Sequence, residues 1–527
     1  MWEKLNNSSL LFSKSFIKNK DVDHIYSNRV FLNRIYFYYI NKGFYNIIIN
    51  GLVDLLVTNF LVFFLIFLMN CINYHDLFTS EERQNMGNFI HIDHFFSQLN
   101  TFFLSILILF FVLDFVKIIS LIDDCYVFGN IRKFYGNTLK IKDHEIEYLT
   151  WKDVLTIWQE VNNTQINPYY INILITTKES YFIALIDQKI IKPIHLNSIF
   201  EWNLIYSIIY SIIDSKESIC VDLLEDTKKI SNQIKLRFKI ISILTMILMP
   251  LIIVFIVFYN LFNYGEQFYN KPSMLISKNF SRISRWKLRN YNEPTHKFEE
   301  RIDKIESLTK LYYNSFKSKL IYASLKFIIF ILSSIFTTLV ILTIINDNVL
   351  INLTIIGGRN VLWFLGLVGS LIAILRTILN TKNDESPQDI MNNLSKFMVI
   401  DDDIIANANT RIVKNNFLKN YKLKFQQIIL DIMFTLIMPI QLWSISYDSD
   451  YITEYLKNIT KKHPKIGYIC LFSDLEHENS YYFGSLIRSE EKDQLIKKIN
   501  FSDELLINQY PEVKSVRFNH SADINFI

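Results

Sequence analysis

Two ionisable residues, Asp114 and Lys117, lie inside an otherwise apolar run from Thr101 to Ile122. They are three positions apart, so a helix places both on one face. A charged side chain inside a membrane-length apolar run is costly and often belongs to an ion or substrate path. The alternative is a pair that satisfies itself near the cytosolic boundary of the membrane. Both interpretations predict a helix that crosses a bilayer with polar groups inside it.

Five other polar residues lie within or beside long apolar runs and could help to line a polar path through the membrane. A polar group that crosses hydrocarbon needs such a path, because otherwise it loses its water without gaining partners. Arg376 could bind a lipid phosphate or extend to the membrane surface. Thr337 and Thr338 could line the path or hydrogen-bond to their own helix. Asn270 and Lys271 follow an apolar run and are expected at the cytosolic face.

Motifs for covalent or metal chemistry are missing from the sequence. It contains no Gly-x4-Gly-Lys-Ser/Thr phosphate loop and no His-Glu-x-x-His zinc helix. His91, Asp93 and His94 form a compact group of possible metal ligands, but in an acidic loop they are more simply solvated. The three aspartates at 401–403 are typical of a solvated turn or a helix N-terminus. We expect no cofactor and no metal, and without a nucleotide site we expect passive transport rather than an enzyme.

Composition indicates a membrane protein with sizeable water-facing parts. Half of the 527 residues are hydrophobic, 15% are aromatic, and the mean hydropathy is +0.18. The net charge of +4 is too balanced to indicate a partner such as nucleic acid. Because the apolar runs are spread along the chain, we expect one membrane-embedded body.

The distribution of basic residues predicts a topology, because cytosolic segments of membrane proteins collect Lys and Arg. The basic segment 1–50 is expected in the cytosol and the acidic loop 73–100 in the lumen. Both termini are then cytosolic. Four apolar runs are predicted to span the membrane, namely Leu55–Ile72, Thr101–Ile122, Phe327–Asn346 and Val361–Leu375.

Two further apolar runs are basic on both sides, which argues against a crossing. Pro250 lies within residues 239–265, and Pro439 lies within residues 430–446. A proline inside a helix removes a backbone donor and clashes with the preceding turn. We therefore predict two re-entrant elements, broken at their prolines, that enter the membrane and return to the cytosolic side.

These elements predict an all-α-dominated polytopic membrane protein, with a cytosolic domain that contains a few short strands. The predicted strands are Tyr169–Thr176 and Tyr181–Ile186, and Trp202–Ile213 is expected on the membrane surface. The predicted parts are a cytosolic segment at 1–50, two spans at 51–122, a cytosolic domain at 123–238, a re-entrant element at 239–265, a basic helical region at 266–318, two spans at 319–380, and a cytosolic C-terminal region at 381–527 that holds the second re-entrant element.

Several local motifs resemble those of the autophagy-related protein 9 family, and they occur in the family's order across residues 40–475. The motifs are Asn41-Lys42-Gly43-Phe44, Cys71-Ile72-Asn73-Tyr74, Phe134-Tyr135, Thr150-Trp151-Lys152-Asp153-Val154, Met249-Pro250, Phe262-Asn263-Tyr264, Tyr291-Asn292-Glu293, Arg376 after Leu365-Gly366, and Gly467 to Phe472.

The resemblance implies a homotrimer with four spans and two partly inserted helical elements in each protomer. It also implies passive, ATP-independent scrambling of phospholipids during autophagosome expansion. The implied location is Golgi- or endosome-derived cytoplasmic vesicles and the preautophagosomal structure, and the implied partners are phospholipids, a bridge-type lipid-transfer protein and autophagy scaffold proteins. Lys117 falls where the family has a basic residue, whereas Gly366 and Ala373 replace polar residues of the family's pore.

Two other functions remain open. An ion channel or a secondary transporter also uses broken helices and buried charge, although transporters usually have two matching halves. A membrane scaffold would recruit partners through its cytosolic domain and use the membrane part as an anchor. Lipid exchange with low ion leak would distinguish a scramblase from a channel. Normal recruitment by a pore-blocked variant would favour a scaffold.

Overall fold

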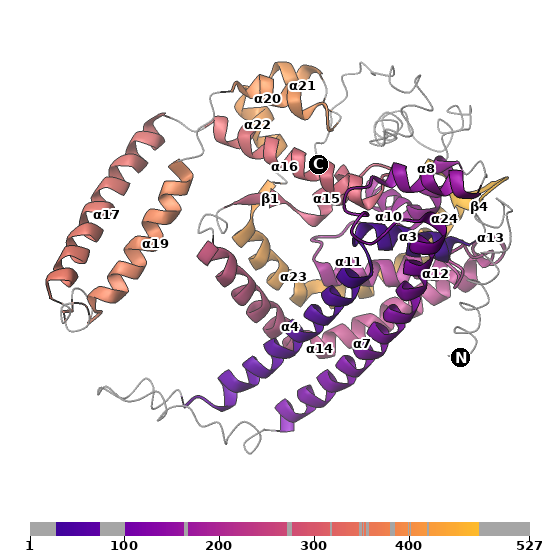
Figure 1. The fold of residues 1–527 in the computed structure, drawn as a ribbon, viewed down its shortest axis with the longest axis horizontal. Helices are drawn as coiled ribbons and strands as arrows, with labels where there is room; N and C mark the ends of the chain where they lie inside the picture. The colour runs from indigo at the N-terminus through magenta and orange to yellow at the C-terminus, as the bar shows by residue number, and fades with distance from the viewer. Residues whose placement is uncertain are drawn as a thin grey trace. The chain divides into compact units, whose positions relative to one another are not determined.

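The structure is a computed structural model that describes residues 28–73, 101–162, 167–270, 277–316, 319–346, 350, 353–354, 358–379, 385–398, 400, 402–418 and 421–473. The described residues are mainly helical (Figure 1). They form two compact units. Unit 1 extends to Ile175 and includes the short segment Pro464–Ile466, and unit 2 contains the rest of the chain from Thr176 onward.

Unit 1 is a set of helices whose starts follow from local chemistry. α3 begins where the Asn28 side chain accepts a hydrogen bond from the backbone N–H of Phe31. α4 begins after Gly43, whose φ of 109° is available to glycine at little cost. The helices are α3 (Arg29–Ile40), α4 (Phe44–Asn70), α7 (Thr101–Lys133), the π-helix η2 (Phe134–Leu139), α8 (Trp151–Asn162) and α9 (Pro168–Ile175).

Buried aromatic side chains form the core of unit 1. The rings of Tyr38 and Tyr135 stack with their centroids 4.8 Å apart, and both residues are fully buried. The Tyr38 hydroxyl donates to Asp143 at 2.5 Å. Arg29 Nη2 donates to the carbonyl of Ile466 at 2.8 Å, which attaches α3 to the segment Pro464–Ile466. The aromatic core therefore joins α3 to the C-terminal end of α7, where η2 begins.

The start of α8 is held by a capping box. Thr150 N–H donates to Asp153 Oδ2 at 2.8 Å, and Asp153 N–H donates to Thr150 Oγ1 at 3.2 Å. The two residues thus satisfy each other's backbone donors at the helix N-terminus. Hydrogen bonds from the side chain and backbone of Thr150 hold the pKa of Asp153 below its ordinary value.

Replacing Asp153 with asparagine is expected to reduce the protection of α8 amides by about 1 kcal/mol at neutral pH. The folded pKa of Asp153 is depressed, so its contribution is present above the unfolded pKa of about 4 and is lost as the pH falls through the folded pKa. Amide hydrogen exchange of α8 across this pH range measures the effect. A wild-type advantage that persisted unchanged at strongly acidic pH would contradict this account.

The described residues of unit 2 form mainly helices, together with two short antiparallel ribbons. Its elements are α10 (Thr177–Asp187), α11 (Ser198–Leu204), η3 (Ile205–Ile209), α12 (Tyr210–Ile212), α13 (Asp222–Glu225), α14 (Thr227–Asn270), β1 (Lys278–Phe280), α15 (Arg282–Leu288), α16 (Thr295–Ser315), α17 (Lys319–Ile345), α19 (Val361–Leu379), α20 (Pro387–Leu394), α21 (Asp402–Ala406), α22 (Arg411–Leu418), β2 (Tyr421–Leu423), α23 (Lys424–Ile445), η5 (Ser446–Asp448), α24 (Ser449–Asn458), β3 (Thr460–His463), β4 (Gly467–Cys470) and η6 (Leu471–Ser473).

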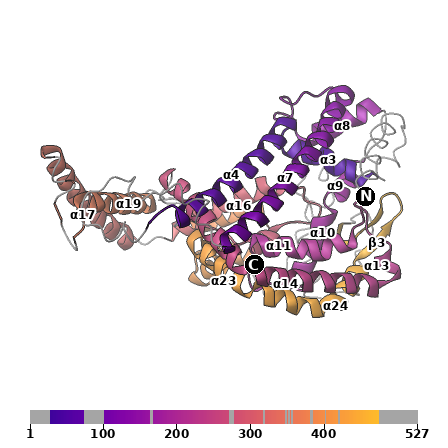
Figure 2. The same cartoon turned by 90° about the horizontal axis from the view of Figure 1, so that it is seen from below.

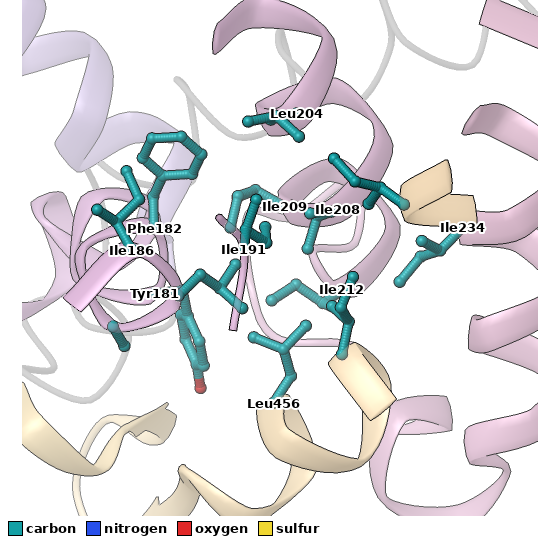
Figure 3. Close-up of a cluster of buried hydrophobic side chains, with 14 of the residues drawn as sticks. Tyr181, Phe182, Ile186, Ile191, Leu204, Ile208, Ile209, Ile212, Ile234 and Leu456 are labelled. Atoms are coloured by element: carbon teal, nitrogen blue, oxygen red, sulfur yellow. The ribbon is translucent and has the colours of Figure 1, made fainter. Parts of the chain in front are cut away.

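The larger core of unit 2 gathers residues from α10 to α14 with others from α23, α24 and the β3–β4 ribbon. Figure 3 shows Tyr181 and Phe182 of α10 near Ile208, Ile209 and other aliphatic side chains. Trp202–Ile213 was predicted on the membrane surface. Its aliphatic side chains are buried in this core, whereas Trp202, Tyr206 and Tyr210 are exposed on the other face, so this location remains a prediction.

A second core joins α16, α20 and α22 with the β1–β2 ribbon. Phe298, Ile302 and Ile305 of α16 are buried against Ile390 and Leu394 of α20, among others. In the ribbon, Lys278, Asn279 and Phe280 pair with Leu423, Lys422 and Tyr421 in antiparallel register. The second ribbon pairs β3 with β4.

The two predicted strands are helices. Tyr169–Thr176 falls on α9 and Tyr181–Ile186 falls on α10. Both segments are buried on all sides, so they carry no polar face and no helical period. Their β-branched residues then suggested strands, but tertiary packing outweighs that weak propensity. The few short strands do exist in the described residues, at other positions.

Neither proline breaks its helix. α14 runs for 44 residues with Pro250 inside it, and α23 runs from Lys424 to Ile445 with Pro439 inside it. The prediction of helical breaks at Pro250 and Pro439 is therefore wrong. The two helices pack against each other, and α24 also lies along α14 (Figure 2). A helix that is packed against its neighbours can contain a proline without ending there. The proline then bends the helix instead of interrupting it.

α14 and α23 are antiparallel, and a buried hydroxyl joins them at Pro439. Ser242 Oγ donates to the carbonyl of Pro439 at 2.7 Å, and both residues are buried. Further along, Ser231 donates to Asp450, one residue into α24. At about 1.5 Å per residue, α14 is about 66 Å long, which exceeds the hydrocarbon thickness of a bilayer. Insertion of residues 239–265 in the membrane remains a prediction.

Among the described residues, four helical segments are long and apolar enough to cross a membrane, and α19 is a shorter apolar helix. The four segments are Phe44–Leu68, Thr227–Asn263, Tyr322–Ile345 and Lys424–Asn458, and the shorter one is Val361–Arg376. They include the first and third predicted spans and both runs that were predicted to be re-entrant. The second predicted span lies in α7, which begins at Thr101.

Candidate intramembrane polar site

The first two predicted spans, α4 and α7, form an antiparallel helical hairpin within unit 1. Gly129 of α7 lies beside Phe44 at the start of α4, and Gly51 lies beside Leu121. Phe63 and Phe111 meet nearer the other end, with ring centroids 6.3 Å apart. This register places the middle of α4 opposite the middle of α7.

The close approach at Gly51 makes a test of this register possible. A Cβ atom at Gly51 would lie 2.6 Å from Leu121 Cδ1, so a valine there must push the helices apart or displace the leucine. Gly51→Val is expected to lower the free energy of unfolding by about 1–3 kcal/mol. Adding Leu121→Ala should restore part of the loss, as measured by thermal unfolding in lipid nanodiscs. Equal stability of the three proteins would contradict the register.

Lys117 lies at the centre of this hairpin and hydrogen-bonds across it. Its Nζ donates to Thr58 Oγ1 of α4 at 3.3 Å, and the same hydroxyl donates to the carbonyl of Asp54 at 2.5 Å. The side chain of Lys117 remains exposed in the isolated chain. A mobile ammonium group on an apolar hairpin can attract a phosphate while its neutral partner competes only weakly.

Asp114 lies one turn before Lys117 but does not pair with it. Asp114 is only 6% exposed, and its Oδ1 has no hydrogen-bond partner among the described residues. The interpretation of the two residues as a self-satisfied pair is therefore wrong. A buried polar atom without a partner is uncommon and costs free energy, so it needs an explanation such as an unseen ligand or a functional role.

The other predicted residues are distributed over unit 2. Thr337 and Thr338 lie on α17, and Thr338 donates to the carbonyl of Ser334 at 2.8 Å, which is the local hydrogen bond that the sequence left open. Arg376 is exposed near the end of α19. Asn270 is the last residue of α14, and Lys271 lies outside the described residues.

The α17–α19 pair is a second apolar hairpin, in which hydroxyl groups bond within their own helix rather than across the pair. Gly369 of α19 faces the ring of Phe336 on α17, where a Cβ would lie 3.3 Å from the ring. Ser334, Thr343 and Ser370 hydrogen-bond to carbonyls of their own helices. These three hydroxyls and that of Thr338 are thus satisfied locally. The stronger candidate for a polar path is the group formed by Thr58, Asp114 and Lys117.

Metal binding finds no support in the described residues, which contain no group of three or more potential ligands. The predicted cluster of His91, Asp93 and His94 lies outside them. In the aspartate run, Asp402 is the first residue of α21, which agrees with a role at a helix N-terminus.

Three polar residues that link apolar helices to other elements were not predicted from the sequence, namely Thr58, Ser242 and His195. Thr58 is the hydrogen-bond partner of Lys117. The sequence could have indicated this residue, because its hydroxyl lies near the centre of an apolar run. Ser242 bonds the carbonyl of Pro439. His195 Nε2 lies 2.6 Å from Asp431 Oδ1, which attaches the segment before α11 to α23. Asp431 is the acidic residue within the apolar helix α23. Because it is surrounded by apolar residues in the sequence, it could have been expected to have a polar partner.

Comparison with known proteins places the chain in a family. Residues 20–476 match the family model described as "Autophagy protein ATG9". The chain is 27% identical over 499 residues to autophagy-related protein 9 of Dictyostelium discoideum, covering 90% of this chain and 71% of that protein. It is 25% identical to the Schizosaccharomyces pombe protein, covering 89% of this chain and 70% of the relative.

Fungal relatives are longer and one solved structure has the same fold. The chain spans only 52% of the Kluyveromyces lactis protein, at 25% identity. The cryo-EM structure of Schizosaccharomyces pombe Atg9 matches with a TM-score of 0.64 at 24% identity, covering 85% of this chain and 99% of that one. Together with the family match over most of its length, these similarities show that the chain belongs to the autophagy protein ATG9 family.

Proposed function

We propose that this chain is a passive, ATP-independent phospholipid scramblase of autophagy vesicles. The observation that carries the proposal is the polar group in the middle of the α4–α7 hairpin, where Lys117 bonds Thr58 and Asp114 keeps a buried oxygen without a partner. Polar groups at such a position stabilise a passing headgroup that hydrocarbon would exclude.

The chemistry of the group suits a zwitterionic headgroup. The ammonium of Lys117 would attract the lipid phosphate, and the carboxylate of Asp114 would attract the positively charged end of the same headgroup. Acyl tails would stay in the bilayer while the headgroup passes. Since the group lowers a barrier equally for both directions, lipids equilibrate between leaflets and no energy source is needed.

A homotrimer forms part of this proposal. α14 and α23 expose many large apolar side chains in the single chain, among them Ile247 and Ile440. Lipid or other subunits must cover these faces, and closed cyclic symmetry is the usual arrangement of identical subunits. We place the assembly in Golgi- or endosome-derived vesicles with both termini in the cytosol, where a bridge-type lipid-transfer protein and autophagy scaffold proteins would act with it.

Lipid exchange in liposomes tests the proposal. Purified full-length protein is expected to equilibrate fluorescent phospholipid between leaflets without ATP, measured by chemical quenching of the outer leaflet. The same liposomes, loaded with a salt-sensitive dye, should show low ion leak. Exchange no faster than in empty liposomes would overturn the scramblase, and ion flux without lipid exchange would indicate a channel.

A further inference from the structure

A second cluster of cations lies in unit 2, where the β1–β2 ribbon meets α16 and α22. Figure 1 shows β1 near α16, and the residues of β1, β2, α16 and α22 share the second core of unit 2. The cluster contains Lys278 of β1 and Lys414 of α22, both half-buried. Arg411 at the start of α22 adds further positive charge beside Lys414.

Two neighbouring aromatic rings hold the two half-buried lysines. Lys278 Nζ lies 4.0 Å from the centroid of the Tyr313 ring, and Lys414 Nζ lies 4.6 Å from that of Phe316. Tyr313 lies in the last turn of α16, and Phe316, three residues further on, is the residue that caps its C-terminus. The two ammonium groups are therefore brought to the same surface from two different elements.

Neither ammonium group has an ion pair or a hydrogen bond among the residues that the structure describes. Burial and the charge of Lys414 lower the pKa of Lys278, and burial and the charge of Arg411 lower that of Lys414. Cation–π contacts compensate part of this cost. Like charges that are fixed together without an acidic partner are best explained by an anion that binds between them.

The position of the cluster along the chain places it beside two apolar helices. Phe316 precedes α17 by only three residues, and the ribbon residue Leu423 directly precedes α23. Both helices are long and apolar enough to cross a membrane, alone or continued into α24. Basic clusters directly next to such helices bind anionic lipid headgroups, each cation contributing about 1 kcal/mol.

We propose that Lys278 and Lys414 form a binding site for a phosphate monoester, with Tyr313 and Phe316 as its aromatic floor. The ligand is a phosphorylated headgroup of a membrane lipid or a soluble phosphate compound of the same chemistry. The site is separate from the α4–α7 polar group, and it depends on the membrane assignment of α17 and α23 but not on scrambling.

Binding of short-chain phosphatidylinositol 4-phosphate to the full chain in detergent tests the site. Wild-type protein is expected to bind it in preference to short-chain phosphatidylcholine. The double variant Lys278→Gln with Lys414→Gln should bind about thirtyfold more weakly. Inositol 1,4-bisphosphate serves as the acyl-free probe. If it binds as tightly as the lipid, the ligand class is a soluble phosphate compound, and if it binds much more weakly, the ligand is a lipid; both results support the site.

Two further variants separate binding from folding and from general charge. Lys228→Gln with Lys310→Gln removes the same charge from exposed positions and should keep wild-type affinity. Lys278→Arg with Lys414→Arg keeps the cations over the rings and should retain most of the binding. Wild-type affinity in the glutamine double variant, an equal loss in the exposed-lysine control, or no preference for the phosphorylated lipid would each overturn the proposal.

Discussion

Replacing Lys117 with leucine is expected to slow phospholipid exchange by roughly tenfold or more while the protein stays folded. The ammonium group lies at the centre of the α4–α7 hairpin, where it hydrogen-bonds to the neutral hydroxyl of Thr58 at 3.3 Å. Within the part of the chain that the structure describes, its removal therefore breaks no ion pair. The loss should fall on the passing phosphate rather than on the fold.

A matched control lies on the same helix. Lys133 is the last residue of α7 and is exposed, so Lys133→Leu makes the same chemical change at the helix end. It is expected to exchange lipid at the wild-type rate. Equal rates for wild type and Lys117→Leu, or an equal loss in both variants, would exclude Lys117 from the path. Arg376→Leu, measured in parallel, tests the second predicted cation.

Replacing Arg301 with alanine is expected to cause the largest loss of stability, about 3–5 kcal/mol. Arg301 donates to both oxygens of Glu293, from Nε and Nη2, at 2.6 Å each. It also donates to the carbonyls of Leu288 at 2.7 Å and Phe397 at 3.0 Å. The Glu293 side chain is 0% exposed, so the variant leaves a buried carboxylate without its cation.

A surface pair on the same helix provides the comparison. Lys297 lies 3.3 Å from Glu300, and both side chains are substantially exposed. Lys297→Ala should change the free energy of unfolding by less than about 1 kcal/mol. Denaturant unfolding in detergent, monitored by helix content, measures both variants. A loss for Arg301→Ala as small as that for Lys297→Ala would show that the buried pair does not hold α15 and α16 together.

The apolar spans could be predicted from sequence because their signal is local. Uninterrupted hydrophobic runs indicated α4 and α17. In α7, Asp114 and Lys117 could be recognised because all of their neighbours in the run are apolar or uncharged. The two strand predictions were wrong because α9 and α10 are largely buried on every side. Such burial removes the hydrophobic periodicity that distinguishes a helix from a strand in a sequence.

The predictions that were wrong, and the residues that were not predicted, depend on contacts between residues far apart in the sequence. Pro250 does not end α14, which continues to Asn270 and packs against α23, a helix far away in the sequence. Thr58 is 59 positions from Lys117, so the bond that replaces the predicted Asp114–Lys117 pair cannot be read from helical spacing. The aromatic floor under Lys278 and Lys414 likewise needs the fold that brings β1, α16 and α22 together.

The central claim is that a wet polar path passes the middle of the α4–α7 hairpin, and thiol accessibility tests it most directly. In a background with the four native cysteines replaced by serine, Thr58→Cys is compared with Phe60→Cys, an apolar position that is 65% exposed on the same helix and serves as the control. A membrane-impermeant thiol reagent should label Thr58→Cys in liposomes and leave Phe60→Cys unlabelled. Equal resistance of both cysteines would contradict the path.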